Sequence, residues 1–511
     1  MAGRTSGLDV KKLGMFGVGS MGAMMSLLYA EHGAEVHFYD PSKANMDALA
    51  KQAKDIKMDK MVVPEKSYEA VCKAIETKGE PKVFVFSTPH GEPADKCVEG
   101  LKPYLNKGDI IVDCGNEHWT NTERRQKDLE PKGVHYIGCG VSGGYQAARA
   151  GPSMSPGGKP EALKKMMPFF QKVAAKDSKG RPCVAPVGPG GSGHYVKMVH
   201  NGIEQGMMSV LAEAWLMMSK GLGLRNDEIR DVFKAWNASG PLSGCFLVAI
   251  GVDVESAKGK DGKYVLDTVR DKVVQDVNEE EGTGTWTCEQ AVMLHVPCSS
   301  ILAAHLFRCA SADLGRRKKN KKSAGGGIEP KALSVDSKAQ FIEQLHMATY
   351  FCFLTCFAQG LDLIRAKDKK EKWGLDYRNV LQLWRGGCII RAKHITDIVL
   401  ERAYARPDHD VDDVLGNPEV ARELTQNYPA LKAVVLKTLE ADGFVPSMSQ
   451  CLEYYKYETS TALPTQFMEA QLDYFGQHMF DRQDDPVGGT TKGQHHHEWK
   501  PATGSSDNKK K

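Results

Sequence analysis

The chain has 511 residues, 41% of them hydrophobic, so it is long enough for two or three domains with apolar cores of their own. Its 67 Lys and Arg nearly balance its 64 Asp and Glu, and the resulting net charge of +3 gives no reason to expect nucleic acid as a partner. The 13 cysteines lack the short paired spacings of a zinc site or a disulfide framework, and no apolar run reaches about 18 residues, so we expect a cytoplasmic protein with reduced thiols, no bound metal and no membrane span.

The first elements of the chain form a βαβ unit. An apolar run from Lys12 to Val18 leads into a glycine-rich turn, a helix-like stretch follows from Ala23 to Glu31, and a second apolar run extends from Glu35 to Tyr39. Further strand candidates, at 82–87 and 109–113, alternate with helical segments. This alternation predicts a parallel sheet covered by helices on both faces, in a first domain over residues 1–185.

The turn Gly17-Val18-Gly19-Ser20-Met21-Gly22 fits G-x-G-x-x-G, in which the glycines allow a tight turn, close approach of a pyrophosphate and packing of a helix on a strand. The pattern is weak alone, but here it follows a strand, opens a helix and precedes Asp40 at the end of the second strand. A glycine turn without a ligand fits that context less well. The Asp40 carboxylate can accept hydrogen bonds from both adenosine ribose hydroxyls and repels a 2′-phosphate. We therefore predict a Rossmann-type site that favours NAD over NADP, with contacts from Gly17, Gly19, Ser20, Met21, Gly22, Asp40 and Ser42.

After residue 185 the pattern changes to long helical periodicities. It predicts a large all-helical domain over 186–480 and a short polar tail over 481–511. The helical domain has a weak internal repeat, since a Gly-Leu pair is followed by a tryptophan both at 223–236 and at 374–384. Between the two copies, the basic run 316–322 is either a nuclear-import signal or, as we expect, a solvated surface loop. The tail contains three consecutive histidines, 495–497, which cannot all face one metal ion.

One helical segment carries a polar stripe. Its members fall at i, i+3, i+4, i+7 and i+8, and they are Lys197, His200, Asn201, Glu204 and Gln205. At 3.6 residues per turn these side chains share one face. Because the flanking sequence is mostly apolar, a stripe that lines a cleft is favoured over a solvated helix face.

The chemistry of the stripe points to a dehydrogenase. A lysine that is uncharged in a buried cleft can take the proton of a hydroxyl group as hydride leaves the same carbon. A β-keto acid formed in this way readily loses carbon dioxide, and Glu204 could then protonate the resulting enol on carbon if an apolar cleft keeps its carboxyl neutral. His200 and Asn201 would hold the substrate carboxylate and hydroxyls. The stripe is therefore compatible with oxidation followed by decarboxylation, in which Lys197 would act as base and Glu204 as acid.

With these features the chain resembles the 6-phosphogluconate dehydrogenase family over nearly its whole length. The ordered matches are Cys114-Gly115-Asn116, Val141 to Gly144, the helix 190–206, Gly282-Thr283-Gly284, Arg308, Trp384 to Arg391, and Asp473 to His478. The resemblance implies Lys197 as base, Glu204 as acid and a homodimer in which His478 reaches the active site of the neighbouring subunit. It also implies substrate contacts from Asn116, Ser142, Gly143, Gly144, His200, Asn201, Gln205, Thr283, Arg308 and His478.

The chain departs from the family pattern at its phosphate contacts. Where the family usually has Asn-Arg-Thr around the 2′-phosphate of NADP, this chain has Asp40-Pro41-Ser42. The family holds the substrate phosphate with a tyrosine, a lysine, a threonine and two arginines, and the matching positions here are Gln205, Glu281, Thr283, Arg308 and Leu472. In the loop after Gly144, Tyr145-Gln146 replaces an acidic pair that contacts the nicotinamide amide. We therefore expect NAD as cofactor and an aldonate substrate, either 6-phosphogluconate or, preferably, an unphosphorylated relative.

Two other functions remain open at this point. One is a β-hydroxyacid dehydrogenase that does not decarboxylate its product, against which Glu204 argues. The other is a catalytically silent paralogue that binds dinucleotide, against which the complete set of Lys197, His200, Asn201 and Glu204 argues.

Overall fold

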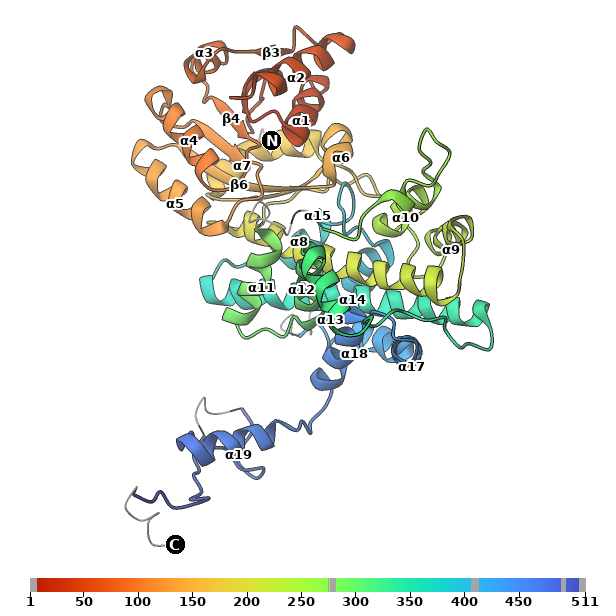
Figure 1. The fold of residues 1–511 in the computed structure, drawn as a ribbon. Coiled ribbons are helices and arrows are strands. Elements are labelled where there is room, and N and C mark those ends of the chain that lie inside the picture. The colour runs from red at the N-terminus through yellow and green to blue at the C-terminus, as the bar shows by residue number, and fades with distance from the viewer. Residues whose placement is uncertain (1–6, 274, 276–281, 406–412, 489–492, 505–511) are drawn as a thin grey trace. The chain divides into compact units, whose positions relative to one another are not determined.

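The computed structural model describes residues 7–273, 275, 282–405, 413–488 and 493–504. Its chain forms two compact units, Met1–Tyr454 and Tyr455–Lys511 (Figure 1). All thirteen cysteines are free thiols. Among the described residues, no group of three or more His, Cys, Asp or Glu side chains is arranged to hold a metal ion.

A seven-stranded sheet organises the first part of the larger unit. Its strands run in the order β3-β2-β1-β4-β5-β6-β7. They are β1 (Lys12–Phe16), β2 (Glu35–Tyr39), β3 (Val62–Pro64), β4 (Val83–Phe86), β5 (Ile110–Asp113), β6 (His135–Ser142) and β7 (Ser153–Gly157). All neighbouring strands are parallel except β6 and β7. The strand order reverses between β1 and β4, and in such sheets the crevice at this point is where ligands bind.

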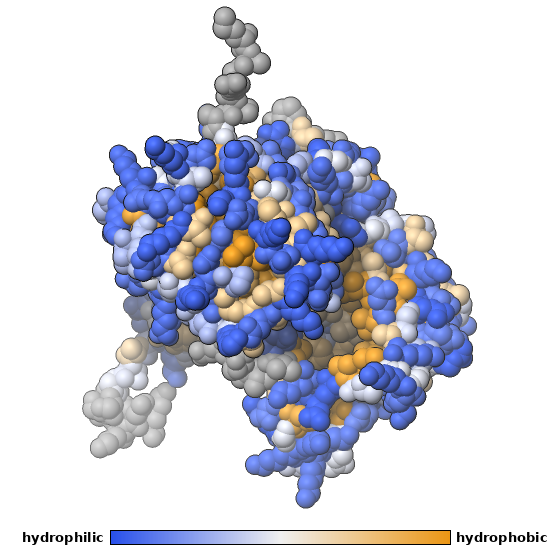
Figure 2. Space-filling model, turned by 90° about the horizontal axis from the view of Figure 1, so that it is seen from above, coloured by the Kyte–Doolittle hydropathy of each residue, from blue (hydrophilic) through white to orange (hydrophobic). Residues whose placement is uncertain are grey.

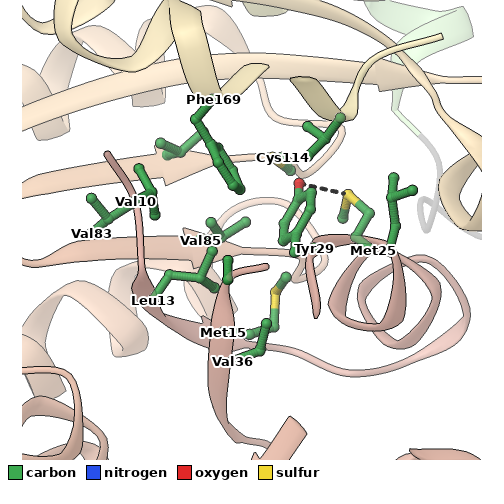
Figure 3. Close-up of a cluster of buried hydrophobic side chains, with 14 of the residues drawn as sticks. Val10, Leu13, Met15, Met25, Tyr29, Val36, Val83, Val85, Cys114 and Phe169 are labelled. Atoms are coloured by element: carbon green, nitrogen blue, oxygen red, sulfur yellow. Dashed lines mark hydrogen bonds between the residues drawn. The ribbon is translucent and has the colours of Figure 1, made fainter. Parts of the chain in front are cut away.

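Helices cover both faces of the sheet, as the alternation of strand and helix patterns predicts. They are α1 (Ser20–Glu31), α2 (Lys43–Asp55), α3 (Tyr68–Ala74), α4 (Glu92–Leu101), α5 (Trp119–Leu129), α6 (Gly144–Ala150) and α7 (Pro160–Val173). One core cluster joins strand residues such as Leu13 and Val85 to Tyr29 of α1 and Phe169 of α7 (Figure 3). The cluster on the other face joins the strands to α3, α4 and α5. The Rossmann-type domain is thus confirmed.

A large helical region follows the sheet and is also confirmed. Its α-helices are α8 (Ser192–Leu216), α9 (Asn226–Ala238), α10 (Phe246–Ser256), α11 (Thr283–Met293), α12 (Ser299–Ala312), α13 (Leu314–Ser323), α14 (Lys338–Glu371), α15 (Tyr377–Leu383), α16 (Leu400–Ala405), α17 (Pro418–Glu440) and α18 (Pro446–Glu458). Short turns of other helix types lie at η3 (Met217–Gly221), η4 (Leu266–Thr268) and η6 (Ile395–Val399). Helix α8 lies at the centre, because it contacts α11, α12, α14 and the sheet strands β6 and β7.

We expected the basic run 316–322 to be a surface loop, but it is part of the helix α13. Asp313 caps this helix by accepting a hydrogen bond from the N–H of Arg316 at 2.8 Å. No residue of α13 is buried, so the run is solvated. The sequence pattern failed here because a good N-cap and helix-forming lysines outweighed the mutual repulsion of the charges.

Helix α14 is long and apolar enough to cross a membrane by length and composition alone. Its most apolar 18-residue window has a mean hydropathy of 1.4, but 89% of that window is buried inside the protein. It packs against α8 and α17, as a core helix does. Hydrophilic residues cover most of the face drawn in Figure 2, and hydrophobic residues gather there in smaller areas.

The smaller unit contains α19 (Thr465–Gly476) and the described part of the tail. Asp473, the one buried residue of α19, accepts hydrogen bonds from Trp499 Nε1 at 2.8 Å, His496 Nδ1 at 2.9 Å and the N–H of His497 at 3.1 Å. One carboxylate therefore holds the tail against the helix through His496, Trp499 and the backbone of His497, whereas His495 lies 2.9 Å from Asp485.

Candidate active site

The glycine-rich turn after β1 lies at the reversal point of the sheet. Gly17 has a φ of +83°, and a Cβ on Gly22 would lie 2.0 Å from the Gly17 carbonyl oxygen, so neither position accepts a side chain. A Cβ on Gly19, by contrast, would meet no atom within 4 Å. The turn is therefore closed toward the protein and open above Gly19, which is the space that a pyrophosphate requires. Gly19 caps α1 without any side-chain hydrogen bond, so the N-terminus of α1 can receive an anion.

Asp40 lies beside this turn, directly after β2. Its Oδ2 accepts a hydrogen bond from the N–H of Val18 at 2.8 Å, and its Oδ1 accepts one from the N–H of Ser42 at 2.7 Å. The side chain of Ser42 in turn caps α2 by accepting from the N–H of Asn45. The structure thus brings together the predicted cofactor residues, which are Gly17, Gly19, Ser20, Met21, Gly22, Asp40 and Ser42. These residues fit a dinucleotide.

The polar stripe of α8 forms one hydrogen-bonded cluster. Lys197 Nζ donates to Asn201 Oδ1 at 2.5 Å and lies 3.4 Å from His200 Nδ1. Asn201 Nδ2 donates to Thr283 Oγ1, the first residue of α11, at 3.1 Å. Lys197 and Asn201 are each 8% exposed and His200 is 1% exposed. These three residues of the stripe therefore lie in the interior and not on a solvated helix face.

His200 connects this cluster to the sheet. Its Nε2 lies 2.9 Å from Ser142 Oγ, at the end of β6, and 3.1 Å from Cys388 Sγ. Burial and the neighbouring charge of Lys197 hold the pKa of His200 well below its ordinary value, although the hydrogen bond with Asn201 acts in the opposite direction. The imidazole is therefore neutral at neutral pH and can exchange hydrogen bonds without adding a charge.

Glu204 lies at the rim of the cluster. Its Oε2 is 3.8 Å from His200 Nδ1, and its side chain is 25% exposed. The carboxyl group thus lies two helical turns along α8 from Lys197 and is more exposed, so the apolar enclosure that the sequence suggested for it is incomplete.

The residues expected near the far end of the substrate are less charged. Gln205 is 8% exposed, and its Oε1 accepts no hydrogen bond from any described residue. It packs on Gly284, where a Cβ would lie 2.4 Å from Gln205 Nε2. Arg308 is half-buried on α12, and Thr283 is buried at the start of α11. Glu281 lies outside the described residues.

The loops of the sheet complete the site. Asn116 follows β5 and is exposed, whereas Gly143 and Gly144 have φ values of +112° and +67°. A Cβ on Gly143 would lie 2.4 Å from the carbonyl oxygen of Gly387, so this loop packs against the backbone before Cys388. His478 and Leu472 belong to the smaller unit.

Three residues near the site were not singled out by the sequence. Cys388 touches His200 and was quoted only as part of a family-like run. The rings of His90 and His118, in the loops after β4 and β5, pack edge-on against Trp286, with centroids 5.1 and 5.0 Å apart. The sequence signal that could have identified His90 and His118 is that each follows one of two neighbouring predicted strands.

Comparison with known proteins agrees with this arrangement. Residues 12–188 match the NAD binding domain of 6-phosphogluconate dehydrogenase, and residues 193–499 match the 6-phosphogluconate dehydrogenase C-terminal domain. The chain is 42% identical to "6-phosphogluconate dehydrogenase, decarboxylating" of Emericella nidulans over 94% of this chain and 100% of that protein. Identity to the Escherichia coli protein of that name is 34%, over 96% and 100%. A Plasmodium falciparum 6-phosphogluconate dehydrogenase structure, solved with NADP+ and with 6-phosphogluconate, superposes with a TM-score of 0.84 at 30% identity, over 96% and 100%. The chain belongs to the 6-phosphogluconate dehydrogenase family.

Proposed function

We propose that this protein is an NAD(P)-dependent oxidative decarboxylase that acts on a β-hydroxy sugar acid. The observation that carries the proposal is the buried cluster of Lys197, His200 and Asn201, joined to Ser142 of the sheet. The decarboxylating relatives and the 6-phosphogluconate in the Plasmodium falciparum structure support it. Nothing in the site favours a dehydrogenase that stops before decarboxylation.

The roles proposed for the residues come from their chemistry and from the family resemblance. Lys197, held by the Asn201 carbonyl oxygen, takes the proton of the substrate hydroxyl. NAD(P)+, when bound, accepts the hydride from the same carbon. Once carbon dioxide has left, Lys197 returns its proton to the oxygen to give an enol. Glu204 then delivers a proton to the carbon while Lys197 takes back the enol proton, which gives the ketone. The position of Glu204 at the rim allows it to recover that proton from solvent after each turnover.

The catalytic assignment predicts a severe loss in Lys197→Ala. We expect kcat to fall about 10²- to 10⁴-fold, since general base catalysis is worth that much, while the dissociation constant of the dinucleotide is unchanged. Glu204→Gln serves as the comparison, because it should slow protonation of the enol more than hydride transfer. Steady-state kinetics and dinucleotide titration measure these effects. Near-normal turnover in Lys197→Ala would mean that another group is the base.

We also propose that NAD is favoured over NADP. A 2′-phosphate would lie against the Asp40 carboxylate, which is fixed by two backbone N–H groups and is not free to turn away. Pro41 offers no donor, and Lys43 already forms an ion pair with Asp47 at 2.7 Å. The structural relative was solved with NADP+, so this chain would differ from it in cofactor choice.

The cofactor proposal predicts a preference for NAD of about a hundredfold or more in kcat/KM, because an unpaired carboxylate beside a phosphate costs a few kcal/mol. Asp40→Asn combined with Pro41→Arg should move the preference toward NADP. Lys43→Ala is the control and should change the ratio little. Comparable kcat/KM values for the two dinucleotides in the unmodified protein would contradict the proposal.

For the substrate, we propose an unphosphorylated or differently substituted sugar acid in preference to 6-phosphogluconate. The buried Oε1 of Gln205 needs a hydrogen-bond donor, which a hydroxyl group has and a phosphate dianion lacks. The Thr283 hydroxyl already accepts a hydrogen bond from Asn201. A desolvated dianion requires several charge-assisted donors, and Arg308 is the one cation at the matching positions, where Leu472 supplies none.

Steady-state kinetics with gluconate and 6-phosphogluconate test this proposal. We expect the higher kcat/KM with the unphosphorylated acid. A value for 6-phosphogluconate of about 10⁴ M⁻¹s⁻¹ or more that also exceeds the value for gluconate would show that other groups restore the lost charge. Gln205→Glu is informative as well, since it should weaken any phosphorylated substrate further.

Finally, we propose a homodimer. The helix α19 exposes large apolar side chains along its length, namely Phe467, Met468, Tyr474 and Phe475, and Phe475 is 70% exposed. A helix this apolar is normally covered by another surface. The family resemblance implies that this surface is the second subunit. It also implies that His478 completes the active site of that second subunit.

The dimer is tested by sedimentation of the full-length protein. We expect a dimer for the unmodified chain and a shift toward monomer for Phe467→Asp with Phe475→Asp, because two buried carboxylates would oppose association. Glu469→Gln, on the same helix, is the control and should leave the mass unchanged. A monomeric unmodified protein with full activity would contradict the proposal.

A further inference from the structure

A buried ion pair joins the carboxyl ends of β4 and β5. Arg125, on α5, donates from Nη1 to Glu117 Oε2 at 2.6 Å, and each side chain is 1% exposed. Glu117 directly follows Asn116, which the family resemblance implies as a substrate contact. The proposed chemistry does not use either charged residue, so the pair needs another explanation.

The pair holds both loops through main-chain groups. In the loop after β4, Gly91 donates its N–H to Glu117 Oε2 at 2.9 Å, and its carbonyl oxygen accepts from Arg125 Nη2 at 2.8 Å. In the loop after β5, Glu117 Oε1 accepts from the N–H of His118 at 2.7 Å and from Asn121 Nδ2 at 2.9 Å. One carboxylate thus links the two loops at the edge of the sheet where ligands bind.

Asn116 lies between two anchored positions of the main chain. On one side, the N–H of Gly115 donates to Asp113 Oδ1 at 3.0 Å, and on the other side the N–H of His118 donates to Glu117. The side chain of Asn116 itself is exposed. A side chain that stands in an open cleft is held mainly by its backbone, so these bonds determine where the Asn116 amide can be.

The network is charged and directional. Burial alone would raise the pKa of the Glu117 carboxyl, but hydrogen bonds from Asn121, Arg125 and Gly91 and the charge of Arg125 hold this pKa below its ordinary value. Apolar side chains of similar size could fill the same space without the desolvation cost of two charges. Hydrogen bonds from charged groups, however, fix orientation as well as distance, which favours a role in positioning.

We propose that Glu117 and Arg125 are positioning residues that hold Asn116 in place for the bound sugar acid. The inference rests on the proposed function, because only that function gives Asn116 a substrate to contact. The pair acts through the backbone on either side of Asn116 and does not itself touch the reacting atoms.

The opposite edge of the same strands provides a matched control. Lys82 precedes β4 and Asp109 precedes β5, and Lys82 Nζ lies 3.2 Å from Asp109 Oδ2 with both side chains buried. Asp109 also accepts hydrogen bonds from the N–H groups of Lys82 and Asn106, each at 2.8 Å. This pair joins β4 to β5 with the same chemistry, but at the amino ends of the strands.

The experiment compares Glu117→Gln with Asp109→Asn in the full-length protein. We expect Glu117→Gln to lower kcat/KM for the sugar acid about a hundredfold, mainly through KM, because a displacement of about 1 Å at a substrate contact can cost that much. Asp109→Asn should lower the melting temperature by a similar amount but leave kcat/KM within about twofold. Equal losses of kcat/KM in the two variants would overturn the inference.

A double-mutant cycle with Asn116→Ala separates positioning from general stability. If Glu117 acts through Asn116, then Glu117→Gln should lower kcat/KM only about threefold or less when Asn116 is already alanine. The same hundredfold factor in both backgrounds would overturn the inference. If Glu117→Gln does not fold, Asn121→Ala takes its place in the cycle, because it removes one hydrogen-bond donor to the Glu117 carboxylate. We expect the same loss of effect when Asn116 is already alanine. An unmodified protein that oxidises no sugar acid would refute the proposed function instead, so the two failures are distinguishable.

Discussion

The close contact between the first turn of α8 and the strands β6 and β7 is the constraint on which the site depends. A Cβ on Gly193 would lie 2.3 Å from the carbonyl oxygens of both Gly138 and Ser155, and a Cβ on Gly140 would lie 2.2 Å from Cβ of Lys197. Side chains at these glycines would push the helix away from the sheet. Because these glycines carry no side chain, α8 can lie close to the sheet. His200 is therefore within hydrogen-bonding distance of Ser142 at the end of β6, and Lys197 lies one turn earlier on the same helix.

Such an approach places polar side chains where water is excluded, so each of them needs a partner inside the protein. Lys197 donates a hydrogen bond to Asn201, Asn201 donates one to Thr283, and His200 shares one with Ser142. The depressed pKa of His200 keeps a second positive charge away from Lys197. Lys197 therefore lies beside a neutral imidazole and an amide oxygen, which hold its amine in place without adding a second cation.

The sequence predicted the elements whose signals are local. The glycine turn, Asp40 and the stripe on α8 depend on spacing along one strand or helix, and the structure has them as the pattern indicates. It did not predict the partners that come from distant segments, since Arg125 reaches Gly91 across 34 positions and Cys388 reaches His200 across 188. The exposed helix at 314–323 was missed for another reason: no apolar face marks it, and the deciding interaction is a single N-cap at Asp313.

The residues of the proposed proton transfers and the residue of the proposed dinucleotide choice lie on different elements of this fold. Lys197 and Glu204 share the helix α8 with Gln205, whereas Asp40 follows β2, and Thr283 and Arg308 come from α11 and α12. Asp40 is held by the backbone of its own turn and touches none of the α8 stripe. A change at such a position alters what binds without displacing Lys197. This separation explains physically how the chain can differ from its family at Asp40 and yet keep Lys197, His200 and Asn201 in one hydrogen-bonded cluster.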